Sequence, residues 1–206
     1  AYWHDDDFGM VRYGQRDEKA GKKLWIWGLS RQGMIWEDLL TDRDGQYAEV
    51  QSGRLFNQSA EQSTFTPFKH RGFTPHVVDR WTEYWYPVAG TKGMVAASRV
   101  GALNATIVGE RLILTLSPVV PIHDTLFVYR GDARIAARAV QRAPFVLYTD
   151  TIAIAGVPRD SLRVTLGADL LTYRVDNAHD ALSRPVDMPA NFDWTSSYGL
   201  YTRGKE

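Results

Sequence analysis

The sequence predicts an all-β protein, and two patterns along its 206 residues lead to that prediction. From about residue 94 onward, short apolar runs recur roughly every ten residues, and turns that contain glycine separate them. Before that point, several runs alternate apolar and polar side chains, as half-buried strands do. Roughly seven to nine strands at this spacing are typical of a β-sandwich of the immunoglobulin or fibronectin type.

Each run defines an expected element. In the later part of the chain, strands are expected at 93–100, 103–108, 111–117, 125–130, 133–140, 145–148, 152–154, 161–166 and 170–176. In the earlier part, strands are expected at 8–13, 23–27, 46–52 and 78–88, and a helical turn at 34–40. Because side chains alternate between the two faces of a strand, the same runs predict the inward-facing residues of the sandwich. These are Leu112, Leu114, Leu116, Phe127, Tyr129, Val164 and Leu166.

A change of composition indicates a domain boundary near residue 93. Most of the aromatic residues precede Pro87, whereas the later part is rich in Ala, Val, Leu, Ile and Arg. The sequence Gly90-Thr91-Lys92-Gly93 lies at the join, and such a glycine-containing stretch is typical of a linker. We therefore expect a first domain over 1–93, an immunoglobulin-like sandwich over 94–182 and a linker over 183–206.

Composition excludes several function classes. Lys and Arg total 24 and so do Asp and Glu, so the formal net charge is zero and nucleic acid is a poor candidate partner. The sequence has no apolar run long enough to span a membrane and no cysteine, which excludes disulfides and thiolate nucleophiles. Asp42-Arg43-Asp44-Gly45 has the spacing of the start of a calcium loop but lacks the later ligands, so a simple turn explains it equally well. No cofactor and no metal site are predicted.

The most informative stretch for function is residues 24–58. Tyr47, Glu49 and Gln51 alternate along one expected strand and therefore share one face. Such a face suits a polar groove, and it equally suits the wetted side of a sheet. Trp25, Trp27 and Trp36 lie in the same stretch, where they are either stacking platforms for a sugar or members of an aromatic core. His4, which precedes three consecutive aspartates, is a further candidate site residue.

Three segments carry a resemblance to a known family. The runs YWHDDDFGMV, GKKLWIWGLSRQGMIWEDLLTDRDGQYAEVQSG and TEYWYPV resemble a bacterial family of unknown function with a galactose-mutarotase-like supersandwich fold, found upstream of tetratricopeptide repeats. The resemblance covers roughly residues 1–95. It implies that 1–93 is the C-terminal portion of such a domain and that 183–206 leads into helical repeats. It also implies a missing N-terminal part of the same domain. Without that part, residues 1–93 would leave an unpaired sheet edge and an apolar face, so we expect the chain either to pair with a second copy as a homodimer or to stay bound to an N-terminal piece.

The resemblance also implies a role for one residue. Glu49, in AEVQSG, matches best the position of the mutarotase glutamate that acts as general base on a sugar's anomeric hydroxyl. Val50 replaces the proline of that pattern, and the general-acid histidine has no matched position, so His4 is a candidate by proximity alone. The expected function is carbohydrate binding or processing, which favours a periplasmic or secreted protein. The alternative is a non-catalytic scaffold that spaces a protein-binding repeat region.

Overall fold

The computed structural model describes residues 1–15, 18, 21–26, 31–41, 45, 47–53, 75–175 and 191–203. Most of these residues are in antiparallel strands, which confirms the all-β prediction. The chain divides into two compact units. The first unit comprises residues 1–15 and 81–180, and the second unit comprises residues 16–80 and 181–206.

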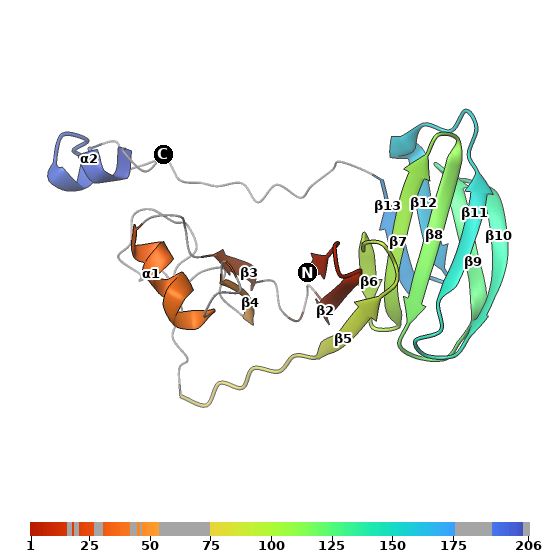
Figure 1. Cartoon of the computed structure of the whole chain (residues 1–206), viewed down its shortest axis with the longest axis horizontal. Coiled ribbons are helices and arrows are strands. Elements are labelled where there is room, and N and C mark those ends of the chain that lie inside the picture. Colours follow the sequence, from red (N-terminus) through yellow and green to blue (C-terminus); the bar gives the residue numbers. More distant parts are fainter. Residues whose placement is uncertain are drawn as a thin grey trace. The chain divides into compact units, whose positions relative to one another are not determined.

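The larger part of the first unit is a sandwich of two four-stranded sheets (Figure 1). One sheet has the order β11-β8-β7-β6 and the other has the order β10-β9-β12-β13. The strands are β6 Ala96–Ser98, β7 Gly101–Val108, β8 Arg111–Pro118, β9 Ile122–Arg130, β10 Ala133–Arg142, β11 Tyr148–Ala153, β12 Leu162–Leu166 and β13 Leu171–Arg174, with a 3-10 turn, η1, at Arg159–Ser161.

The two sheets enclose an aliphatic core. Leu112, Leu114 and Leu116 of β8 are inside it, as predicted, and so are Val164 and Leu166 of β12. The prediction was wrong for Phe127 and Tyr129, because Leu126 and Val128 are the buried side chains of β9. Residues 126–129 of this strand are apolar on both faces, so their alternation does not specify which face is inward. The two aromatic rings lie outward, where the guanidinium groups of Arg134 and Arg163 cover them at 5.6 and 4.0 Å.

A second difference concerns the strands expected at 145–148 and 152–154. The structure has one continuous strand here, β11, which pairs with β8 from Tyr148↔Leu116 to Ala153↔Arg111. Phe145 lies before β11 with a φ of 63°, which is outside the β region, so it does not extend the strand. Thr149 and Asp150, which lie between the two expected strands, pair with Thr115 and Leu114 and so belong to this one ladder.

A three-stranded sheet completes the first unit. It has the order β1-β2-β5, with β1 Tyr2–Trp3, β2 Phe8–Gly14 and β5 Glu83–Ala89. Its buried residues Val11, Tyr86 and Val88 form one cluster with Ala102 of β7. The Tyr86 hydroxyl lies 2.6 Å from the carbonyl oxygen of Ser98 and 2.8 Å from that of Gly101. The boundary expected near residue 93 therefore falls inside this unit, because β5 packs against the first residues of the sandwich.

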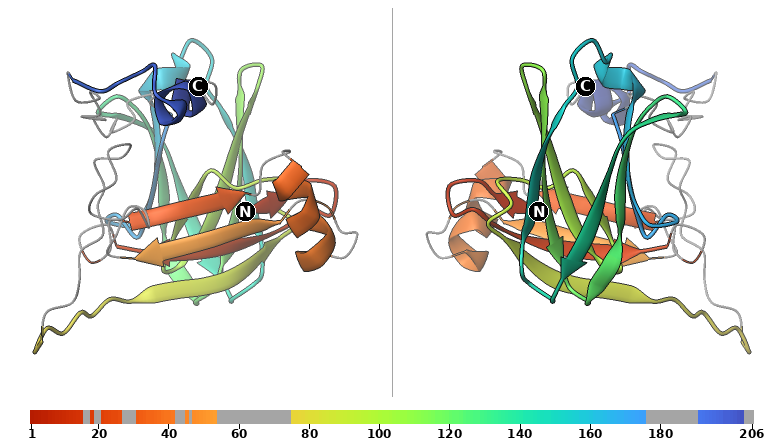
Figure 2. Two further views of the ribbon diagram at one scale, coloured as in Figure 1. Left: turned by 90° about the vertical axis from the view of Figure 1, so that its left-hand side faces the viewer. Right: turned by 90° about the vertical axis from the view of Figure 1, so that its right-hand side faces the viewer.

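The second unit contains a two-stranded hairpin and two helices among its described residues. The strands are β3 Gly21–Ile26 and β4 Ala48–Gly53, drawn in orange in Figure 2, and the helices are α1 Arg31–Leu40 and α2 Ser197–Arg203. The helix α1 contains the turn expected at 34–40. The helix α2 lies within the segment expected to be a linker, and the Ser196 hydroxyl caps it by accepting a hydrogen bond from the Gly199 N–H at 3.0 Å.

Candidate functional site

The hairpin places a tryptophan directly opposite the candidate glutamate. In the β3–β4 pairing, Trp25 is the register partner of Glu49, and Lys23 is the partner of Gln51. Directly opposed residues of an antiparallel pair project from the same face of the sheet, with Cβ atoms about 4.5–5.5 Å apart. The Trp25 side chain is 41% exposed, so this face presents an accessible aromatic ring beside a carboxylate.

Polar neighbours along β4 hold the Glu49 carboxylate. The Tyr47 hydroxyl donates to Glu49 Oε2 over 3.4 Å, and the Gln51 side-chain amide donates to Glu49 Oε1. Partial burial raises the pKa of Tyr47, and the adjacent Glu49 charge raises it further, so the phenol stays protonated and remains a donor. The three side chains that share one face thus form a single hydrogen-bonded row, with the carboxylate at its centre.

The other predicted site residues are distributed differently. Trp36 lies on α1 of the second unit, 41% exposed. His4 belongs to the first unit, where its ring lies 5.3 Å from the ring of Tyr2. Trp27, Asp42 and Asp44 lie outside the described residues. Within the described ranges, no three His, Asp or Glu side chains are grouped in a way that would hold a metal ion.

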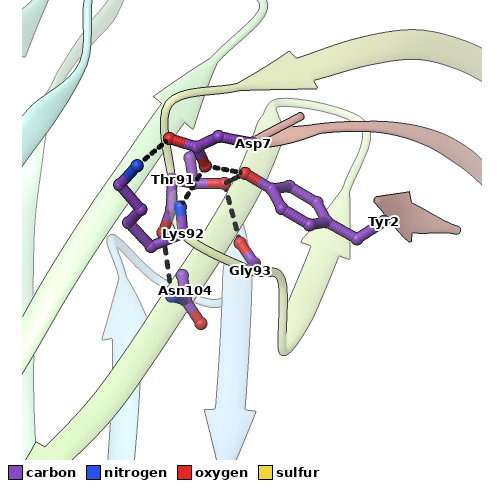
Figure 3. Close-up of polar contacts among 6 residues, drawn as sticks. All are labelled: Tyr2, Asp7, Thr91, Lys92, Gly93 and Asn104. Carbon is purple, nitrogen blue, oxygen red and sulfur yellow. Dashed lines mark hydrogen bonds and ion pairs between the residues drawn. The ribbon is translucent and has the colours of Figure 1, made fainter. Parts of the chain in front are cut away.

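A polar network in the first unit was not predicted from the sequence. Asp7, in the turn between β1 and β2, forms an ion pair with Lys92 at 2.7 Å and accepts a hydrogen bond from the Lys92 backbone N–H at 2.8 Å. The Tyr2 hydroxyl also donates to Asp7, and Figure 3 shows Thr91 beside it. The network connects the N-terminal turn to the segment that follows β5. Residues 85 positions apart in sequence form it, so no local pattern reveals it.

These contacts change the acidity of Asp7. Hydrogen bonds from Lys92 and then from Tyr2 lower the pKa of the Asp7 carboxyl from its ordinary 3.8 to about 2. The charged form is therefore favoured in the folded chain, and the same pairing raises the pKa of Lys92.

Replacing Asp7 by Asn is expected to destabilise the first unit at neutral pH and to have little effect in strong acid. Because the folded pKa is below the ordinary value, the charge stabilises the fold above about pH 4, and this contribution is lost as the pH falls toward 2. Urea unfolding of wild type and Asp7→Asn at several pH values measures the difference. A difference in unfolding free energy that is equal at both ends of the range would show that the Asp7 charge has no part in it.

The fold and these sites define an all-β chain with an exposed tryptophan–carboxylate hairpin. Comparison with known families finds a match for the N-terminal part of the chain. The model of a family described as Domain of unknown function (DUF5107) matches residues 1–88. The match ends within β5, so it spans the three-stranded sheet, the hairpin and α1, and it stops before the sandwich. This supports the expected resemblance to a family of unknown function. No solved structure matches the chain. Among the described residues, no helix has the length and apolarity needed to cross a membrane.

Proposed function

We propose that this chain is a carbohydrate-recognition module whose binding face is the β3–β4 hairpin. The observation that supports the proposal most directly is the register pair Trp25↔Glu49, with Tyr47 and Gln51 hydrogen-bonded to the carboxylate. A sugar needs an aromatic surface for its C–H face and polar groups for its hydroxyls, and this face presents both.

Each residue has a defined role in the proposal. Trp25 stacks against the apolar face of one sugar ring, and Glu49 accepts hydrogen bonds from two neighbouring hydroxyls. A charged acceptor makes hydrogen bonds about twice as strong as those of a neutral one. Tyr47 and Gln51 fix the carboxylate so that little side-chain freedom is lost when the sugar binds. The finer proposal is action at an anomeric centre, in which Glu49 takes the proton of the anomeric hydroxyl as a general base.

Replacing Trp25 by Ala is expected to weaken sugar binding at least about tenfold, which corresponds to about 1.4 kcal/mol. A glycan array probed with the full chain identifies the ligand, and calorimetric titration then compares the variants. Glu49→Gln keeps the shape of the side chain but removes its charge, so we expect weaker binding and, if the chain processes the sugar, a larger loss of turnover.

Leu24→Ala provides the matched control for these variants. Leu24 neighbours Trp25 on β3, projects from the opposite face and is 62% exposed, so its replacement tests the hairpin without touching the proposed site. Equal affinity of wild type and Trp25→Ala, or an array with no bound glycan, would contradict the proposal.

The second candidate function is a non-catalytic scaffold, and one observation favours it. The outer face of the three-stranded sheet carries Trp3, Phe8 and Trp85, each between 44% and 51% exposed. Trp3 and Phe8 are register partners with stacked rings 6.2 Å apart. Exposed aromatic surface of this kind is typical of protein–protein contacts. Under this alternative, the array shows no glycan, and the hairpin variants behave as wild type in every binding measurement.

A further inference from the structure

The first unit contains a cavity of about 540 Å³ beside the Asp7–Lys92 network. Its walls come from the N-terminal turn, the segment after Lys92, β7, η1 and β13. A volume of this size lies within the range of roughly 300–1,000 Å³ that small-molecule sites occupy. Polar side chains in its lining include those of His4, Lys92, Asn104, Arg159 and Tyr173. All of them belong to the first unit.

The basic side chains that line the cavity are those of His4, Lys92 and Arg159. No carboxylate is among the described residues that line it. Asp7 pairs with Lys92 at 2.7 Å, but Arg159 has no ion pair or hydrogen bond with any described side chain. An exposed guanidinium with five donors and no carboxylate partner is suited to a carboxylate or a phosphate, which it binds through two parallel hydrogen bonds.

Neutral hydrogen-bonding groups also line the cavity. Asn104 is 8% exposed, and its side-chain amide donates to the Thr91 carbonyl oxygen at 2.8 Å, which fixes its orientation (Figure 3). Its Oδ1 atom accepts no hydrogen bond from any described residue, yet it is not sealed from solvent. Burial raises the pKa of Tyr173, whose phenol therefore stays a donor. The lining of the cavity thus includes an acceptor, on β7, and a donor, on β13, for ligand hydroxyls.

The absence of a side chain at Gly93 lets the backbone at this residue lie close to the Asn104 side chain. The φ of Gly93 is +136°, and a Cβ at this position would lie 3.3 Å from the Asn104 side chain, closer than most such contacts. The backbone therefore passes tightly over the amide, and the amide has little freedom to turn away. A wall fixed before the ligand arrives lowers the entropic cost of binding.

We propose that this cavity binds a small hydroxylated organic anion. Arg159 and Lys92 hold its carboxylate or phosphate, and Asn104 and Tyr173 contact its hydroxyl groups. The site is independent of the proposed sugar site, because it uses no residue of the hairpin and lies in the other unit.

Calorimetric titration of the full chain tests the proposal with three probes: glucuronate for a carboxylate, glycerol 3-phosphate for a phosphate, and glucose as the neutral analogue. We expect saturable binding of at least one anion and no comparable binding of glucose. We also expect the affinity to fall as salt is added, because the contacts are charged. Arg159→Gln is expected to weaken binding about tenfold or more, since a bidentate charged contact is lost.

Two variants make the result specific. Arg130→Gln is the matched control, because Arg130 is also exposed on the first unit but does not line the cavity, and it is expected to bind as wild type does. Trp25→Ala is expected to leave anion binding unchanged, which separates this site from the hairpin. The proposal is overturned if neither anion binds saturably, if glucose binds equally well, or if Arg159→Gln and wild type have the same affinity. A loss of anion binding in Trp25→Ala would assign the anion to the hairpin and would also overturn it.

Discussion

Replacing Leu114 by Ala is expected to lower the free energy of unfolding of the first unit by about 2–5 kcal/mol. Leu114 is the middle member of the three buried leucines of β8, and none of its surface is exposed. It belongs to the core cluster that both sheets of the sandwich share. Truncation removes the favourable free energy of transferring the lost methyl groups from water to the core. It also leaves a cavity, because β8 is held between β7 and β11 and cannot move to fill it.

Urea unfolding followed by far-ultraviolet circular dichroism measures the effect. Val108→Ala is the control within the same sandwich, because Val108 is 58% exposed at the end of β7 and its replacement is expected to change stability by less than about 0.5 kcal/mol. Unfolding of Leu114→Ala at the same urea concentration as Val108→Ala would mean that β8 does not form the centre of the core.

The sandwich was predictable from sequence where the alternation was unambiguous. On β8, Arg111, Thr115 and Ser117 are polar and Ile113 is the one apolar member of their set, so the leucines at 112, 114 and 116 are the more apolar set and the pattern favours them as the buried face. On β9, Leu126 and Val128 alternate with Phe127 and Tyr129, and both sets are apolar. Only the position of β9 between β10 and β12, with arginines on its outer side, decides which set is buried. That information is tertiary and is absent from the strand itself.

The candidate sites show the same limit. That Tyr47, Glu49 and Gln51 share a face follows from their spacing, because side chains on a strand have a period of two. The position of Trp25 opposite Glu49 depends on the register between β3 and β4. This register is set by the pairing of two strands and cannot be read from either strand alone. Asp7 and Lys92 are further apart still. In both cases the sequence supplied the residue types, and strand pairing supplied their proximity.

The domain boundary illustrates a different limit. The composition changes near residue 93, and the family match ends at residue 88, so sequence alone separates the two regions there. The packing does not separate them, because the Tyr86 hydroxyl of β5 lies within hydrogen-bonding distance of the backbone carbonyls of Ser98 in β6 and Gly101 in β7. Burial raises the pKa of Tyr86, which keeps this hydroxyl protonated as a donor. The change of composition near residue 93 therefore lies within one compact unit, residues 1–15 and 81–180.

Gly101 lies where the sandwich and the three-stranded sheet meet, and replacing it by Ala is expected to cost about 2–4 kcal/mol of unfolding free energy. Its φ is +155°, and a Cβ here would lie 2.4 Å from the Ser117 carbonyl oxygen and 2.9 Å from the Pro118 Cα. Both atoms belong to the backbone of β8, so no side-chain rotation relieves the clash. The first pair of the β7–β8 ladder, Gly101↔Pro118, would have to separate.

Gly109→Ala isolates the part of this cost that comes from steric contact. Gly109 also has a positive φ, +57°, but no atom lies within 4 Å of a Cβ built there, so only the backbone penalty of about 1–2 kcal/mol applies. Chemical unfolding of both variants is therefore expected to show Gly101→Ala as the less stable by at least about 1 kcal/mol, because the clash with β8 adds to the backbone strain. Equal stability of the two variants would mean that β7 and β8 are not held this closely at Gly101.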